Sequence, residues 1–414
     1  MKRALLAASL LLIAACSGPK RTSVSDMERG SQPTPSNKEE KPQPEKKPEV
    51  VEGPTKQPEP EKKPEVKAAQ VKRGKLEDPA EPEQKRALDI IERVTGLKFK
   101  TPIPVYIYTP EDLTEEMKDW GDGYVPENVM GFYRPDTKTF YLVPKVAGNN
   151  RSFGLRVHEA THALQDQHFD LIKLHESVKT SDADDALTAL IEGHAVQVMI
   201  DGLSDLSPHV AKIAEVREPS DKHNPNAWST VFYYAMGAKF VQHLLKNAEG
   251  YPGVHKAFGR VPVSSEQILH PEKYLGELDL PHKITPDFDA IKAELPEGWK
   301  VKDVDTLGEW QTRLWIMTSE AAYSAAADAA AGWGGDFEIT LVRDDKPQAW
   351  LKLRITSWDS ESEADEFCEA LALMGTTVHY TQDGDKVLIV SSSEPLGTLP
   401  CNKLERAMGK SKFE

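Results

Sequence analysis

Apolar side chains recur every three or four residues along residues 83–94, which predicts an amphipathic helix that stops at Gly96. Residues 104–108 combine β-branched and aromatic side chains and therefore predict a strand. Residues 131–143 contain two apolar stretches on either side of Pro135-Asp136, a dipeptide typical of a turn, and therefore predict a β-hairpin. This part of the chain is expected to combine a helix with a small sheet.

Two longer patterns follow, and each predicts a helix. Residues 152–166 carry enough apolar side chains to bury one face, namely Phe153, Leu155, Val157 and Leu164. Residues 184–199 form the second predicted helix. Its start resembles a capping box, with Ser181 followed three residues later by Asp184.

The pattern changes in the last part of the chain. The alanine-rich residues 306–330 predict a helix that closes at Gly332. Beyond it we expect a ββαββ order, an antiparallel sheet with a helix on one face, from residues 337–342, 349–356, 360–373, 377–380 and 386–390. The predicted fold class is therefore α+β.

The stretch 17–80 lacks the composition of a folded domain, because it holds 11 of the 30 prolines and no Phe, Trp or Tyr. Such a segment cannot bury enough apolar surface to offset its ordering entropy, so a disordered tether is expected. The sequence PEKKPEV occurs in it twice, and frequent prolines favour a semi-rigid, extended spacer. Folded structure is expected as one domain over residues 81–300 and a smaller one over residues 301–414.

Residues 1–16 have the features of an export signal. A basic head precedes an apolar run that is too short to cross a bilayer. The run ends in small residues before Cys16, which resembles the lipobox of bacterial lipoproteins. We therefore predict lipidation of Cys16 and localisation at the bacterial cell envelope, with the membrane contacted through the lipid anchor only.

The net charge bears on possible partners, and the cysteine content bears on a possible disulfide. The net charge is −15, and an acidic protein lacks the basic footprint that nucleic acid requires, so no nucleic-acid partner is expected. Besides Cys16 the chain has Cys368 and Cys401, which could form one disulfide in an exported protein.

The sequence His158-Glu159-Ala-Thr-His162 lies in the first of the two predicted long helices. Residues four apart share one face of a helix, so both imidazoles can bind one ion. Glu159 lies about 100° further round the helix, beside the ion, where it can take a proton from a zinc-bound water. Asp166, four residues after His162, is a candidate to orient that imidazole.

Two residues compete to be the third metal ligand. His168 follows His158 by ten residues, which is the metzincin spacing, but Gln165 stands where that pattern has a glycine that turns the chain out of the helix. Glu192 lies in the second long helix, and a glutamate from a second helix gives a His₂Glu site with an open position, the gluzincin arrangement. We favour Glu192, with His168 as the alternative.

Residues 157–170 closely resemble a group of largely uncharacterised bacterial zincin-like proteins. Further stretches are similar to the same group, namely residues 189–195, 264–274, 305–309 and 332–336. The resemblance extends over about residues 85–395. It implies a zincin-like metallopeptidase domain with an active-site helix, in which zinc is bound by the gluzincin ligands His158, His162 and Glu192.

The resemblance departs from better-known gluzincins at one position. Val196 stands four residues after Glu192, where thermolysin-like enzymes carry an aspartate, so another residue must orient the histidines. A His or Tyr often stabilises the oxyanion in this superfamily. The sequence offers His270, Tyr233 and Tyr234 for that role and does not choose among them.

The expected function is hydrolysis of a peptide or protein substrate by zinc-activated water, with Glu159 as general base. One alternative is a non-catalytic envelope lipoprotein that keeps the zinc-binding scaffold. The intact Glu159 counts against it, because zinc binding needs the histidines but not this carboxylate. The other alternative is a zinc hydrolase that acts on a non-peptide amide.

Overall fold

The structure is a computed structural model, and it describes residues 74–119, 130–143, 150–204, 219, 222, 224–276, 278–375 and 378–413. These residues belong to one unit of the chain, which includes Val71–Glu414. The predicted signal sequence, Cys16 and nearly all of the predicted tether lie outside the described residues. No described helix is both long and apolar enough to span a membrane.

The first sheet has four short strands in the order β1-β2-β4-β3, which are β1 (Lys75–Leu76), β2 (Val105–Ile107), β4 (Thr139–Leu142) and β3 (Gly131–Arg134). β2 pairs with β4 in parallel, whereas β3 pairs with β4 antiparallel. The hairpin predicted over residues 131–143 and the strand predicted over residues 104–108 are both confirmed. β3 is the outermost strand beside β4.

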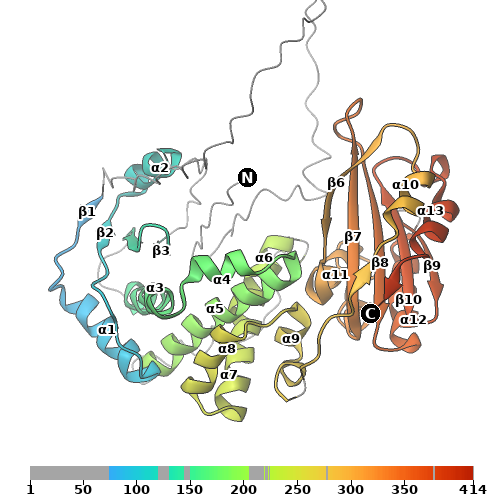
Figure 1. The fold of residues 1–414 in the computed structure, drawn as a ribbon. Helices are drawn as coiled ribbons and strands as arrows, with labels where there is room; N and C mark the ends of the chain where they lie inside the picture. The colour runs from blue at the N-terminus through green and yellow to red at the C-terminus, as the bar shows by residue number, and fades with distance from the viewer. Residues whose placement is uncertain are drawn as a thin grey trace, which may run out of the picture. The chain divides into compact units, whose positions relative to one another are not determined.

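Three helices pack together next to this sheet, namely α1 (Pro82–Thr95), α3 (Asn150–Phe169) and α5 (Ser181–Leu203). Figure 1 shows α3 and α5 side by side. α1 ends as predicted at Gly96, which adopts the left-handed conformation of a helix C-cap. α5 is buried along nearly its whole length, so both long helices contribute to the core. The shorter α2 (Pro110–Asp119) and α4 (Leu171–Ser177) complete this part of the chain.

The predicted capping box of α5 is wrong. Thr180 is the N-cap, and its hydroxyl accepts a hydrogen bond from the Ala183 amide at 3.2 Å. Ser181 lies inside the helix and bonds to Asp305 instead. The error arose because Thr180 offers the same capping chemistry one residue earlier in the sequence.

A second group of helices packs against α5. It consists of α6 (Pro225–Thr230), the π-helix η3 (Val231–Met236), α7 (Gly237–Asn247), α8 (Tyr251–Gly259) and α9 (Ser265–Leu269). α5 and α7 approach closely at Gly193 and Gly237, where a Cβ atom on Gly193 would lie 2.1 Å from the carbonyl carbon of Gly237. Only glycine allows the two backbones to pass at this distance, directly after Glu192.

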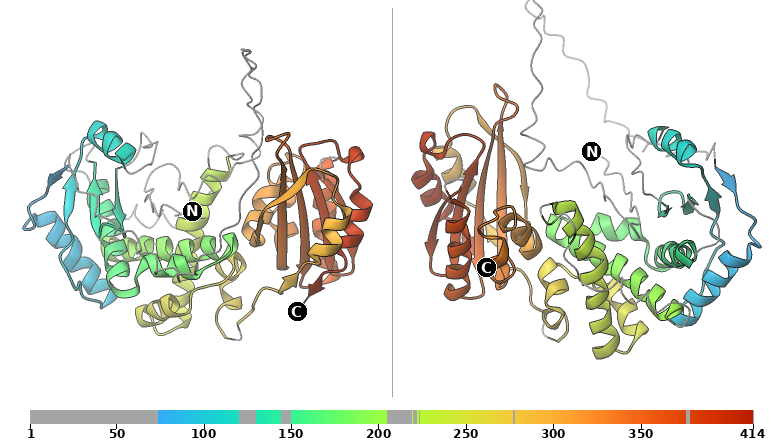
Figure 2. Two further views of the ribbon diagram at one scale, coloured as in Figure 1. Left: turned by 45° about the horizontal axis from the view of Figure 1, so that its top comes forward. Right: turned by 180° about the vertical axis from the view of Figure 1, so that it is seen from behind.

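The C-terminal sheet is antiparallel, and its strand order is β6-β7-β8-β10-β9. Figure 2 shows these strands in orange to red from two sides. The strands are β6 (Trp299–Asp305), β7 (Trp333–Arg343), β8 (Trp350–Trp358), β10 (Lys386–Ser392) and β9 (Val378–Asp383). The predicted ββαββ order is confirmed for β7 to β10 and α12 (Glu361–Leu373), and the class α+β is confirmed with it.

One detail of the C-terminal prediction is wrong, and the question of a disulfide is answered. Helices cover both faces of the sheet, because α12 packs with Val387 and Ile389 whereas α13 (Cys401–Met408) packs with Leu388 and Val390. Cys368 on α12 and Cys401 on α13 therefore lie on opposite faces, and both are free. The helix α10 (Phe288–Glu294) joins α13 on its face.

The helix predicted over residues 306–330 is only partly present. α11 (Gly308–Ile316) is followed by turns and by short 3₁₀ segments over Tyr323–Ala325 and Asp328–Ala330. Alanine has the highest helix propensity, but tertiary packing overrides propensity here. The small side chains pack closely in a shared core instead, as shown by the buried Ala322, Ala326, Ala329 and Ala330.

Candidate metal centre

α3 and α5 bring the three sequence-predicted ligands together. His158 Nε2 lies 3.0 Å from His162 Nε2 and 3.1 Å from Glu192 Oε2, and His162 Nε2 lies 3.3 Å from the same oxygen. The two imidazole rings are nearly perpendicular, at 84°. Bonds of about 2.0–2.1 Å in a tetrahedral zinc site hold ligand atoms about 3.3 Å apart. Both the donor types and their spacing therefore fit a zinc ion.

All three side chains are buried, which makes their charges interdependent. Burial favours a raised pKa for Glu192, but the imidazoles of His162 and His158 outweigh it and lower that pKa to about 2. Burial favours a lowered pKa for His162, but the Glu192 carboxylate outweighs it and raises that pKa to about 9. Burial dominates at His158 and lowers its pKa. Glu192 is therefore ionised, and a bound cation would replace a proton on the imidazoles.

Glu159 is buried beside this group rather than in it. Its Oε2 accepts a hydrogen bond from the backbone amide of Tyr133 in β3, at 2.9 Å. The ligand set identified by geometry is His158, His162 and Glu192. The structure thus places a carboxylate next to the candidate ligands and ties it to the outermost strand of the first sheet.

His168 does not join the candidate ligands. α3 continues to Phe169, as expected without a glycine at position 165, and this directs His168 to another contact. Its Nε2 lies 2.8 Å from the carbonyl oxygen of Lys98. His168 therefore joins α3 to the segment that follows α1, near the protein surface.

The residues that contact the ligands from outside differ from the sequence expectation. Asp166 does not contact His162, because its Oδ2 accepts hydrogen bonds from the Tyr133 hydroxyl and from Lys138 Nζ, both at 2.7 Å. Gln165 takes that place, with its Oε1 2.8 Å from His162 Nδ1. Its position three residues after His162 on the same helix is the signal in the sequence, because side chains three apart are neighbours on a helix surface.

The three oxyanion candidates occupy different places. The ring of Tyr234, in η3, lies 5.9 Å from the ring of His158. Tyr233 donates its hydroxyl hydrogen bond to Asp185 at 2.7 Å, and His270 Nε2 lies 3.1 Å from Glu309 Oε1. Tyr234 therefore contacts a candidate ligand.

A second group of carboxylates has ligand-like spacing, but it surrounds a cation of the chain itself. Lys273 Nζ lies 2.6 Å from Glu266, 2.6 Å from Asp359 and 3.1 Å from Asp279. The ammonium group occupies the position that a metal ion would take. This cluster is therefore an ion-pair network that joins α9 to the C-terminal sheet.

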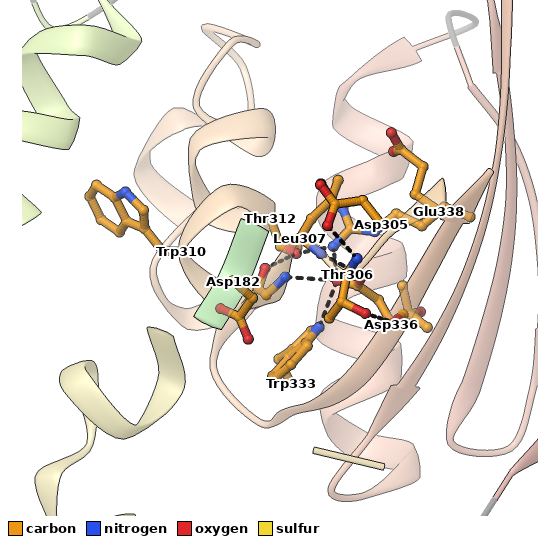
Figure 3. A network of polar contacts seen from close by, with 12 residues as sticks. Asp182, Asp305, Thr306, Leu307, Trp310, Thr312, Trp333, Asp336 and Glu338 are labelled. Carbon is orange, nitrogen blue, oxygen red and sulfur yellow. Dashed lines mark hydrogen bonds and ion pairs between the residues drawn. The ribbon is translucent and has the colours of Figure 1, made fainter. Parts of the chain in front are cut away.

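The start of α5 is fixed to the end of β6 and to the segment that follows it, as Figure 3 shows from close by. Ser181 N donates to Asp305 Oδ1 at 2.8 Å, and Asp182 N donates to the carbonyl oxygen of Thr306 at 3.1 Å. Asp182 Oδ1 in turn accepts from the amide of Ser265 at 2.7 Å. Burial raises the pKa of Asp182 well above its usual range. These contacts anchor the helix that carries the third candidate ligand.

Asp336 holds the same segment from the other side (Figure 3). It accepts hydrogen bonds from Leu307 N at 2.8 Å, Gly308 N at 3.0 Å, Trp333 Nε1 at 3.0 Å and Arg354 NH2 at 2.6 Å. Gly308 has a φ of 81°, in the left-handed region that favours glycine. We call these five residues the Asp336 network.

Comparison with known protein families matches residues 298–396 to a family described as Domain of unknown function (DUF8575). The match begins one residue before β6 and ends beyond β10, so it contains the C-terminal sheet and the whole Asp336 network. It does not extend to α3 or α5. No curated protein matches the chain.

Proposed function

We propose that this protein is a zinc-dependent metallopeptidase of zincin-like, gluzincin type, held at the cell envelope by a lipid on Cys16. The observation that carries the proposal is the convergence of His158, His162 and Glu192 within 3.3 Å of one another, with the Glu159 carboxylate beside them. Two imidazoles and a carboxylate are the donor set of catalytic zinc sites that keep a position open.

The residues divide the chemistry between them. Zinc at these donors would supply Lewis acidity, lowering the pKa of water and polarising the substrate carbonyl. Glu159 is the general base that accepts a proton from the attacking water and later delivers it to the leaving amine. The hydrogen bond from Tyr133 N holds Glu159 Oε2 in place. Tyr234, next to His158, is the best placed of the three candidates to donate to the oxyanion.

The strand β3 supports a peptide as the substrate. The backbone groups of Phe140 and Leu142 in β4 form hydrogen bonds on the side of β2. Their partners in β3 are Tyr133 and Gly131, which therefore direct their backbone N–H and C=O groups away from β4. One of these outward groups, Tyr133 N, already reaches Glu159. An extended peptide that adds to the outer side of β3 would run past the candidate metal centre.

The substitution Glu159→Gln tests the proposal. Glutamine cannot accept the proton, and general-base catalysis contributes about 10²–10⁴-fold, so hydrolysis of a peptide library should fall by that factor. Zinc content and melting temperature should stay near those of the wild type, because Glu159 is not in the ligand group. Glu338→Gln, which removes a buried carboxylate from the C-terminal sheet, is the matched control and should cleave normally.

Two results would contradict the proposal. Loss of zinc from Glu159→Gln would make Glu159 a ligand. Cleavage that is insensitive both to this substitution and to a chelator, or no cleavage by the wild type across a broad library, would remove the peptidase assignment.

A further inference from the structure

Gln165 is the residue that links a candidate ligand to its surroundings. It lies on α3, and its Oε1 is 2.8 Å from His162 Nδ1. Its Nε2 is 2.9 Å from the carbonyl oxygen of Ile191 and 2.9 Å from His194 Nδ1, both on α5. One buried amide therefore contacts both helices of the metal centre.

The Ile191 carbonyl decides which way this amide points. A carbonyl oxygen can only accept, so the amide nitrogen of Gln165 must face it. That nitrogen also faces His194 Nδ1, which therefore accepts, and the proton of the His194 ring is on Nε2. The amide oxygen is left facing His162, so His162 carries its hydrogen on Nδ1 when a metal is bound.

This pattern assigns a role to His194. We propose that His194 is a positioning residue of the metal centre. Together with the Ile191 carbonyl it holds the Gln165 amide, so that His162 directs the lone pair of Nε2 towards His158 and Glu192. The inference rests on the metal site of the proposed function but not on the reaction. Gln165, held by His194, is then the group that orients His162, in place of the aspartate that is absent at Val196.

The surroundings of His194 suit a fixed acceptor. The side chain is fully buried, and its ring contacts Phe258 at 5.5 Å and His255 at 5.9 Å in edge-to-face geometry. It lies two residues after Glu192, so one helix carries both a candidate ligand and the group that orients another. A rotation of the ring would break these contacts together with the bond to Gln165.

The experiment compares three variants in the full-length chain, by zinc affinity in chelator competition and by the visible spectrum of the Co²⁺-substituted protein. His194→Phe keeps a ring but removes the acceptor, and loss of an outer partner of a ligand typically costs about 10–100-fold in metal affinity. His194→Asn restores an acceptor near the position of Nδ1 and should recover most of the affinity. His255→Phe changes a neighbouring ring without a bond to Gln165 and should bind zinc like the wild type.

The Co²⁺ spectrum separates positioning from loss of stability, because it reports the geometry of the ligands. We expect it to change in His194→Phe and to return in His194→Asn. Wild-type affinity and an unchanged spectrum in His194→Phe would overturn the inference, as would His194→Asn binding as weakly as His194→Phe. If His194→Phe does not fold, His194→Met removes the same acceptor with a more flexible apolar side chain and is judged by the same criteria.

The outcomes also separate this inference from the proposed function. A wild-type protein that binds zinc but cleaves no peptide would contradict the peptidase assignment without contradicting the role of His194. A wild-type protein that binds no zinc would remove both.

Discussion

Two buried carboxylates in this molecule, Glu192 and Asp336, are compensated in different ways. Asp336 accepts hydrogen bonds from two backbone amides, an indole and the guanidinium of Arg354. Glu192 contacts the ring nitrogens of His158 and His162. The first carboxylate is paired with a permanent positive charge of the chain, whereas the second faces groups that are neutral once they lose a proton.

The difference explains why one site is a scaffold and the other a candidate for chemistry. Burying a charge is costly unless it is paired and hydrogen-bonded, and the Asp336 network meets that condition from within the chain. Around Glu192 the same condition is met either by a proton on the imidazoles or by an added cation. A proton and a zinc ion therefore compete for one place.

The Lys273 cluster shows that spacing alone does not identify a metal site. Its three carboxylates lie as close together as ligands do, yet an ammonium group is between them. The chemical nature of the donors is the better criterion. Imidazole nitrogen is a good ligand for zinc, whereas the charge of the three carboxylates is already balanced by a lysine.

The largest effect is expected from Glu192→Ala, which removes the anionic donor. We expect zinc affinity to fall by more than 100-fold, beyond the loss of about 10–100-fold that is typical for outer partners of a ligand. Isothermal titration with zinc measures it. His168→Ala is the control and should leave affinity unchanged, because His168 bonds to Lys98. The opposite pattern would make His168 the third ligand.

A smaller effect, on stability rather than on metal binding, is expected from Arg354→Met. This change leaves Asp336 buried without its cation, which typically costs about 3–5 kcal/mol of unfolding free energy. Urea denaturation measures it, and zinc should still bind to the folded variant.

Lys352→Met, two residues earlier on β8, is the matched control. Its ion pair with Glu338 is partly exposed, so about 1 kcal/mol or less is expected. Equal losses in the two variants would show that the Asp336 network contributes no more than an ordinary surface pair. Loss of zinc in the folded Arg354→Met variant would show that the two regions are not independent.

The sequence was most informative where a chemical motif coincided with a strong helical pattern. The spacing of His158 and His162 predicts that both lie on one helix face, and Glu192 is predicted from the second long helix. The structure brings these three side chains together. Gln165 and His194 could not be found in this way, because their role depends on how α3 and α5 pack against each other.

The same limit applies to the fold. The hairpin over residues 131–143 and strands β7 to β10 follow from local alternation and turn residues. β6 does not follow from the sequence, because after the buried Trp299 its side chains are mostly exposed and do not alternate between buried and exposed positions. The helix over residues 306–330 was overextended because alanine propensity says nothing about the tight packing of Ala326 and its neighbours.

The most direct test of the account is X-ray absorption at the zinc edge of the wild-type protein loaded with one zinc per chain. The account predicts two imidazole nitrogens at about 2.0–2.1 Å and one carboxylate oxygen at about 2.0–2.2 Å, with the remaining position taken by solvent. A spectrum that requires three imidazoles or a sulfur ligand, or a protein that retains no zinc after dialysis, would contradict it.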